Sequence, residues 1–251
     1  MHIPSHHPTQ NSAIHARKTT NPRTGHYAPI TYTLAKPPTI PTDHRKNTMP
    51  SPRVAVVVYS MYGHIAKMAE SVKAGIISAG GSADILQVPE TLPKEILERL
   101  NAPPKPNYPV ISSGHLLEYD AFLFGIPTRY GNMPAQWKAF WDSTGHLWSR
   151  GRLSGKYAAL FVSTASLGGG QEATAMNTLS TLAHHGMIYV PFGYAHAFEE
   201  MAGLQEVRGG SPWGSGTLAG GDGSRQPSEL ELELAKVQGR SFYDVVSRVK
   251  F

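Results

Sequence analysis

Short runs of apolar, often β-branched residues alternate along the chain with segments in which apolar residues recur every three or four positions. The runs predict strands buried on both faces, and the recurring positions predict amphipathic helices between them. The predicted strands are residues 53–59, 83–88, 121–125, 156–164 and 187–192. The predicted helices run from Ile65 to the Gly80–Gly81 pair, over 94–100, 135–143 and 171–185, and from Ser228 onward.

Five strands that alternate with helices predict an α/β fold, a doubly wound five-stranded parallel sheet with helices on both faces. In such a sheet the carboxyl ends of the strands lie along one edge, and ligands bind there. We therefore expect the functional residues in the loops that follow the first, third, fourth and fifth strands.

The last helix has a clear start signal. Ser228 precedes Glu231 by three positions, which is the spacing of a capping box, with Ser228 as the N-cap. The buried stripe of this helix is predicted to consist of Leu230, Leu234, Val237, Val245 and Val249.

Composition separates residues 1–50 from the rest of the chain. They hold eight of the 20 prolines and six of the 12 histidines, and they carry the whole net charge of +5. We expect a disordered tail here and one domain over residues 51–251. The tail is either an upstream extension of a native start at Met49 or a targeting segment, with the mitochondrion as its candidate destination. The 17 basic and 17 acidic residues of the domain cancel, so it lacks the basic surface that nucleic-acid binding needs.

Several function classes are disfavoured. The chain has no cysteine, which excludes disulfides, thiol catalysis and cysteine-ligated metals. Neither an H-E-x-x-H metal motif nor a G-x-S-x-G nucleophile elbow is present, so we predict no metal site and no hydrolase. No apolar stretch approaches the ~20 residues of a membrane span.

The loop after the first strand, Ser60–Ile65, is suited to a phosphate group. Backbone N–H groups at a helix start, together with a hydroxyl, form an anion site. The loop lacks the lysine of a Walker motif, which argues against nucleoside triphosphate hydrolysis. An ordinary turn between strand and helix is the alternative.

Two further loops at the same edge offer flat surfaces and hydroxyl groups. Residues 127–132 contain Arg129 and Tyr130, and residues 163–170 combine hydroxyls with glycines that let a flat heteroaromatic ring approach. A merely flexible loop and a solvated arginine are the alternatives. Residues 168–173 also match the G-x-G-x-x-A dinucleotide fingerprint, but they follow the fourth strand rather than the first.

Four longer strings make the chain recognisable. They are Tyr59–Ile65 (YSMYGHI), Gly125–Asn132 (GIPTRYGN), Thr181–Met187 (TLAHHGM) and Ala219–Pro227 (AGGDGSRQP). From about Arg53 to Val249 the chain resembles the WrbA-type NAD(P)H:quinone oxidoreductases. The stretches Ala102–Pro106 and Ala135–Trp141 are most similar to the fungal members. The resemblance implies a flavodoxin-like fold with strand order 2-1-3-4-5, FMN as cofactor, and NADH or NADPH as co-substrate.

The resemblance also implies roles for individual residues. Those expected to hold the FMN phosphate are Ser60, Met61, Tyr62, Gly63, His64 and Ile65. Those expected around the isoalloxazine ring are Thr128, Arg129, Tyr130, Ser163, Thr164, Ala165, Ser166, Leu167, Gly168, Gly169 and His184. Tyr62 is expected to contact the nicotinamide, and Trp148 and Tyr194 the quinone. A cytoplasmic homotetramer whose active sites draw on neighbouring subunits is implied as well.

The implied reaction is a ping-pong cycle in which FMN takes a hydride from NAD(P)H and passes it to a quinone. Two alternatives stay open: a one-electron flavodoxin-type carrier, and an FMN-containing stress-linked or membrane-associated scaffold with little turnover. One departure from the family lies in the loop after the fourth strand, where Ala165 stands in place of a glycine. We expect its methyl group to crowd the loop if the backbone there needs a positive φ.

Overall fold

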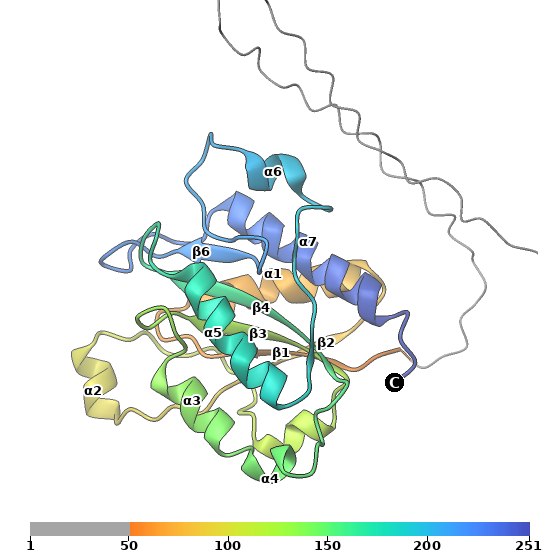
Figure 1. The fold of residues 1–251 in the computed structure, drawn as a ribbon. Coiled ribbons are helices and arrows are strands. Elements are labelled where there is room, and N and C mark those ends of the chain that lie inside the picture. The colour runs from red at the N-terminus through yellow and green to blue at the C-terminus, as the bar shows by residue number, and fades with distance from the viewer. Residues whose placement is uncertain (1–50) are drawn as a thin grey trace, which may run out of the picture. The chain divides into compact units, whose positions relative to one another are not determined.

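A computed structural model of the chain describes residues 51–251, so the predicted disordered tail, residues 1–50, lies outside the described residues. The strands are β1 (Val54–Val58), β2 (Ala83–Gln87), β3 (Ala121–Pro127), β4 (Tyr157–Thr164), β5 (Ile188–Tyr189) and β6 (Gly216–Leu218). They pair in parallel in the order β2-β1-β3-β4-β5 (Figure 1). The predicted α/β fold and the strand order 2-1-3-4-5 are confirmed.

The prediction of one continuous fifth strand over 187–192 is wrong. β5 pairs only with Tyr157 and Ala158 at the start of β4, and β6 pairs with residues 162–164 at its end. Pro191 has no N–H to continue the ladder, and Gly193 turns the chain away with φ 63°. Two short strands therefore share the edge of the sheet, and residues 190–215 are inserted between them.

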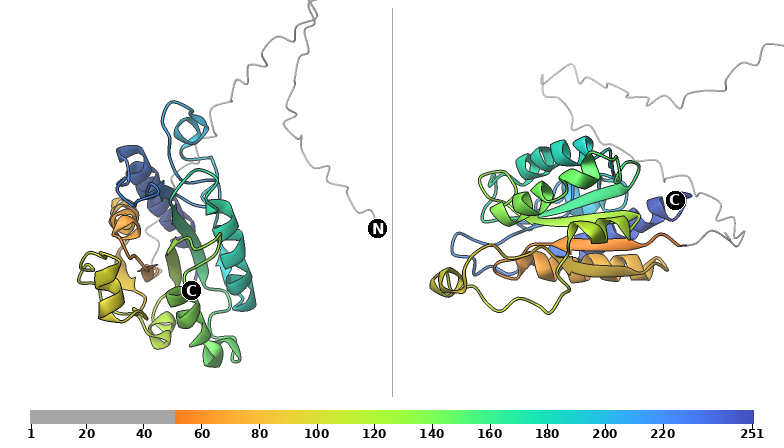
Figure 2. Two further views of the ribbon diagram at one scale, coloured as in Figure 1. Left: turned by 90° about the vertical axis from the view of Figure 1, so that its left-hand side faces the viewer. Right: turned by 90° about the horizontal axis from the view of Figure 1, so that it is seen from below.

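Helices cover both faces of this sheet (Figure 2). Helices α1 (His64–Ser78) and α7 (Glu229–Val246) lie on one face, and α3 (Ala135–Asp142) and α5 (Gln171–His184) lie on the other. The remaining helices are α2 (Lys94–Arg99), the 3₁₀ helix η1 (Ser113–Leu117), α4 (Gly145–Trp148) and α6 (Phe198–Ala202). The pattern of apolar positions did not predict η1, α4 or α6, because one turn of helix is too short to show a period.

The position of β1 in the middle of the sheet explains why all of its residues are apolar. Val54, Val56 and Val58 pack under α1 and α7, whereas Ala55 and Val57 face the side of α3 and α5. Every residue of the strand is at most 1% exposed. The strand is buried on both faces, as central strands of a parallel sheet are.

Close contact between α1 and α7 sets which side of α7 is buried. A Cβ on Gly239 would lie 2.0 Å from the carbonyl oxygen of Val72, so only glycine fits at this crossing. Phe242 and Val246 follow Gly239 on the same face and are buried. The predicted stripe is therefore correct at Leu234 and Val237 and wrong at Val245, which is 41% exposed. Leu230 and Val249 are half-buried.

A buried histidine lies between α3 and the end of α5. The Thr144 hydroxyl donates to the carbonyl of Trp141, so its oxygen accepts from Nε2 of His185 at 3.0 Å. Nδ1 is then the unprotonated nitrogen. Within residues 51–251 neither it nor the buried Trp141 Nε1 has a hydrogen-bond partner. Burial lowers the pKa of His185 below its ordinary 6.5, and the neighbouring His184 adds to the shift.

This histidine should make the fold sensitive to acid. Below pH 6.5 the unfolded chain binds a proton that folded His185 resists, so the free energy of unfolding falls as the pH decreases. The variant His185→Gln keeps an N–H donor for Thr144 but does not titrate, and it should lose less stability between about pH 7 and about pH 5. Urea unfolding at both pH values measures the difference, with His196→Gln, at an exposed histidine, as control. Equal losses for the wild type and His185→Gln would contradict the assignment.

Among the helices of residues 51–251, none combines the length and the apolar character that a membrane span requires.

Candidate functional site

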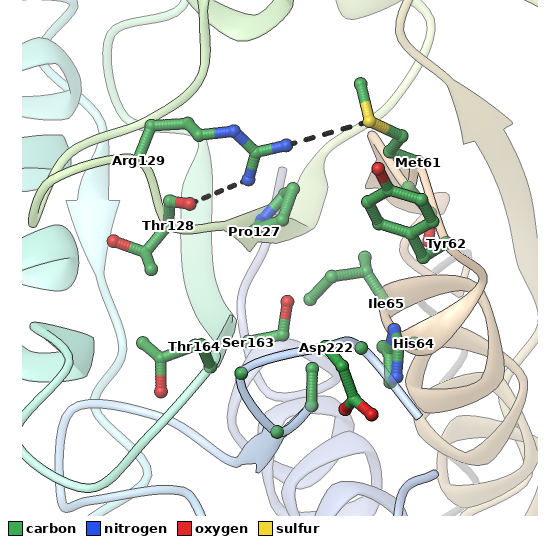
Figure 3. Close-up of a pocket in the computed structure, with 16 residues that line it drawn as sticks. Met61, Tyr62, His64, Ile65, Pro127, Thr128, Arg129, Ser163, Thr164 and Asp222 are labelled. Carbon is green, nitrogen blue, oxygen red and sulfur yellow. Dashed lines mark hydrogen bonds between the residues drawn. The ribbon is translucent and has the colours of Figure 1, made fainter. Parts of the chain in front are cut away.

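A cavity of about 310 Å³ opens at the carboxyl edge of the sheet (Figure 3). Four loops form it, and they follow β1, β3, β4 and β6. Its lining residues are Ser60, Met61, Tyr62, His64, Ile65, Pro127, Thr128, Arg129, Ser163, Thr164, Ala165, Ala219, Gly220, Gly221, Asp222 and Gly223. The predicted loops after the first, third and fourth strands thus meet at one place.

The loop after β1 presents unpaired backbone donors to this cavity. The N–H groups of residues 61–65 form no hydrogen bond within residues 51–251, and the Ser60 hydroxyl accepts only a long bond of 3.4 Å from the N–H of Ala66. Gly63 is the N-cap of α1 with φ 89°, a left-handed conformation that glycine adopts without strain. No acidic side chain occupies the first turn of α1. The arrangement is suited to a phosphate dianion.

The loop after β3 is a tight turn in which Arg129 and Asn132 exchange two backbone hydrogen bonds of 2.7 and 2.9 Å. Both central residues have positive φ, 56° at Tyr130 and 75° at Gly131. Contacts with α5 hold the turn, because the hydroxyls of Thr128 and Thr174 lie 2.7 Å apart and the Asn177 amide donates to the carbonyl of Gly131. Thr128 and Arg129 line the cavity, and the ring of Tyr130 is fully exposed beside it.

Tyr130 therefore has a strained backbone conformation, and its exposed side chain makes no buried contact that would offset the strain. Asparagine tolerates this conformation far better than tyrosine. We expect Tyr130→Asn to raise the free energy of unfolding by about 1 kcal/mol, measured by urea denaturation. Asn101, with φ 51°, is the other non-glycine residue of residues 51–251 with positive φ, and Asn101→Tyr should have the opposite sign. A loss of stability in Tyr130→Asn would show that the ring packs in solution.

The loop after β4 contributes less of its length to the cavity than predicted. Ser163, Thr164 and Ala165 line it, whereas Ser166, Leu167 and Gly168 face a second depression bounded by the start of α5 and by Arg208. Gly169 lines neither. The expected crowding at Ala165 does not arise, because its φ is not positive and a methyl group there is unstrained.

A fourth wall, Ala219–Gly223, was missed. It follows β6, a strand too short for its three residues to show a period, and the surrounding glycines read as irregular chain. Asp222 is its only charged side chain, and hydrogen bonds from the N–H and hydroxyl of Ser224 hold the pKa of that carboxyl below its usual range. The useful signal was topological, since any residue that follows a parallel strand reaches the ligand edge.

Besides the residues of the loops named above, three further predicted site residues lie outside this cavity. His184 is exposed at the carboxyl-terminal end of α5, about 20 Å along the helix from the loop after β4. Trp148 ends α4 and is 55% exposed, and Tyr194 packs against Phe198 beyond β5. Their contacts with cofactor or quinone stay predictions.

A partly buried polar cluster forms around Tyr59, the residue that precedes the loop after β1. Glu90 accepts hydrogen bonds from the Tyr59 hydroxyl, from Lys105 and from the Gln136 amide, and the Lys105 ammonium lies 4.4 Å from the centre of the Tyr59 ring. Burial opposes the charge of Glu90, but the hydrogen bonds from Lys105 and Leu92 outweigh it and lower its pKa. Burial, with the charge of Glu90, raises the pKa of Tyr59.

The donor set of the cavity fits a flavin mononucleotide. Free N–H groups at α1 suit its phosphate, hydroxyls of Thr128 and Ser163 suit a polyol or a ring edge, and Arg129 offers a planar cation. Within residues 51–251 no group of three or more histidine, aspartate or glutamate side chains is placed to hold a metal ion.

Comparison with known proteins is consistent with this fit. The profile of the NADPH-dependent FMN reductase family matches residues 52–199. The chain is 60% identical to "Protoplast secreted protein 2" of Saccharomyces cerevisiae, over 78% of this chain and 99% of the relative. It is also 60% identical to "NAD(P)H quinone oxidoreductase PST3" of Candida albicans, over 79% of this chain and 100% of the relative.

Among solved structures, a flavodoxin, WrbA-like protein from Agrobacterium tumefaciens is similar with a TM-score of 0.54 at 23% identity, over 78% of this chain and 97% of that one. At 23% identity this similarity is evidence for the fold alone.

Proposed function

Because the chain belongs to the NADPH-dependent FMN reductase family, we propose that it is an FMN-dependent NAD(P)H:quinone oxidoreductase. Three of the relatives, which are 60%, 58% and 56% identical to this chain, carry the name NAD(P)H quinone oxidoreductase. The observation that carries the proposal is the row of unpaired N–H groups, residues 61–65, which open into a cavity of about 310 Å³.

Each wall of the cavity has a task in this proposal. The N–H groups of residues 61–65 hold the FMN phosphate without a lysine. Thr128 and Arg129 hold one side of the ring, and Ser163 to Ala165 hold the other. When bound, FMN supplies hydride transfer between the nicotinamide and the quinone. The cavity lining holds a single histidine, His64, whose Nε2 is bonded to the carbonyl of Arg225, and a single carboxylate, Asp222. In this proposal the chain therefore acts mainly by positioning flat molecules against one another.

Tyr62 and Tyr130 provide the exposed aromatic surfaces at the rim. The Tyr62 hydroxyl donates to the carbonyl of Leu100 at 3.2 Å, which fixes its ring at the edge of the cavity. We propose that nicotinamide and quinone bind in turn beside these rings, as a ping-pong cycle requires. The same Tyr130→Asn variant that gains stability should therefore lose quinone turnover.

Neither Trp148 nor His184 lines the cavity of this chain. We propose a homotetramer in which a neighbouring subunit contributes both. The expected result for Trp148→Ala is a several-fold rise in the KM for benzoquinone, because the quinone loses a flat apolar wall, while FMN stays bound. Steady-state kinetics and the visible spectrum measure the two effects. Unchanged kinetics would remove Trp148 from the site.

The decisive experiment uses the purified full chain. FMN is added, the unbound flavin is removed and the visible spectrum is recorded; NADH or NADPH then follows anaerobically, and benzoquinone last. Bleaching by the nicotinamide and recovery with benzoquinone support the proposal. Bound FMN that NAD(P)H does not reduce favours the carrier or scaffold alternatives. Protein that retains no FMN overturns the proposal.

We also propose that the domain works in the cytoplasm. The family profile matches residues 52–199, so residues 1–48 lie outside the matched region. A fluorescent fusion of the full chain that accumulates in mitochondria, while residues 49–251 do not, would instead assign the tail a targeting role.

A further inference from the structure

Residues Ala219–Pro227, here termed the clamp segment, join two walls of the cavity that are far apart in sequence. At its start, the N–H of Ala219 donates to the carbonyl of Thr164 at 2.8 Å, and the N–H of Gly220 donates to that of Ala165 at 2.9 Å. These bonds continue the pairing of β6 with β4 and attach the clamp segment to the loop after β4.

The other end of the clamp segment is attached to α1. Nε2 of His64 lies 2.8 Å from the carbonyl oxygen of Arg225, and because that oxygen only accepts, Nε2 carries the proton. One turn later, Lys67 donates to the side-chain oxygen of Gln226 at 2.6 Å. His64 is 5% exposed, and its own backbone N–H belongs to the row that faces the cavity. The clamp segment therefore fixes the first turn of α1 against the loop after β4.

The side chain of Arg225 holds the clamp segment in this position. Nη1 donates to both carboxylate oxygens of Glu231, at 3.1 and 2.9 Å, and to the carbonyl of Leu218 at 2.6 Å. Nη2 donates to the carbonyl of Val207 at 3.1 Å. The side chain of Glu231 is fully buried, so the ion pair is shielded from water on that side. Only the fork of a guanidinium reaches these three acceptors at once.

We propose that Arg225 is a positioning residue for the phosphate end of FMN, an inference that rests on the proposed function. Arg225 does not line the cavity, whereas Gly220–Gly223 within the same clamp segment do. It acts through the main chain: the guanidinium fixes the clamp segment, and the Arg225 carbonyl fixes His64 and with it the amides of α1. A phosphate on those amides depends directly on this chain of contacts, whereas Ser163, which is proposed to hold one side of the ring, is also held by the pairing of β4 with β3.

The test compares FMN with riboflavin, which lacks the phosphate. Both are titrated against the apo form of the full chain by flavin fluorescence. Arg225→Met is expected to weaken FMN about tenfold and riboflavin by less than about threefold, and Arg225→Lys to fall between the wild type and Arg225→Met. Arg208→Met is the matched control, because Arg208 also donates to backbone carbonyls, of Glu200 and Gly209 at 3.0 Å, but lies at the second depression. It should leave the affinity for FMN unchanged.

Equal losses for FMN and riboflavin in Arg225→Met, or no loss of either, would overturn the inference, and the first result would make Arg225 a general structural residue. If Arg225→Met does not fold, Arg225→Lys, which keeps the charge but lacks the fork, must by itself show the selective loss of FMN. A wild type that binds neither flavin overturns the proposed function as well. A wild type that reduces quinones while Arg225→Met binds FMN normally overturns this inference only.

Discussion

Replacing Gly63 with valine should weaken FMN binding about thirtyfold. Gly63 has φ 89°, and a β-branched residue in the left-handed region costs about 2 kcal/mol. Without a bound phosphate the N–H groups of residues 61–65 have no hydrogen-bond partner within residues 51–251, so the turn that precedes His64 can relax. Phosphate binding restores the left-handed conformation, and 2 kcal/mol of strain then corresponds to roughly a thirtyfold rise in the Kd.

Gly80 provides a matched control at the other end of the same helix. Its φ is 84°, and a Cβ at Gly63 or at Gly80 would meet no atom within 4 Å. Steric clash with the protein is therefore absent at both positions, and the backbone cost is comparable. Gly80→Val should lower the free energy of unfolding while leaving the Kd of FMN at the wild-type value. Equal effects of the two variants on FMN affinity would show that the turn after β1 does not bind the phosphate.

The parts of the fold that repeat along the sequence could be predicted, and the parts fixed by a single contact could not. β1 and β3 are buried on both faces, so their apolar runs are unambiguous. The split of the fifth strand depends on Pro191 and Gly193, whose effect appears only once the pairing with β4 is known. The wrong placement of Val245 has the same origin, because the contact of Gly239 with α1 selects the buried face of α7.

The candidate site likewise has a part that could be predicted from the sequence and a part that could not. Loops that directly follow β1, β3 and β4 meet because parallel strands end at one edge, and this needs no knowledge of side chains. The wall Ala219–Gly223 follows a strand of three residues, which carries no period of its own. His184 and Trp148 do not line the cavity, so the roles that the resemblance implies for them stay predictions.

Glu231 has more hydrogen-bond partners than the capping-box spacing in the sequence predicts. The capping box was predicted, and the structure confirms it, with the N–H of Ser228 donating to Glu231 at 2.9 Å. The same carboxylate also accepts from the N–H of Gly209, from the hydroxyl of Thr217 and from Arg225. One buried side chain thus joins the inserted segment, β6, the clamp segment and α7.

Replacing Glu231 with glutamine should lower the free energy of unfolding by about 3–5 kcal/mol, the cost of breaking a buried ion pair. All partners of Glu231 donate, so the amide group of glutamine would place N–H against N–H, and Arg225 would keep an uncompensated charge. Urea unfolding measures the loss. Glu233→Gln is the control, since Glu233 lies on the same helix but is 59% exposed in its pair with Lys236, and it should change stability by less than about 0.5 kcal/mol. A loss below about 1 kcal/mol in Glu231→Gln would mean that water reaches this carboxylate and that the four segments are held together by other contacts.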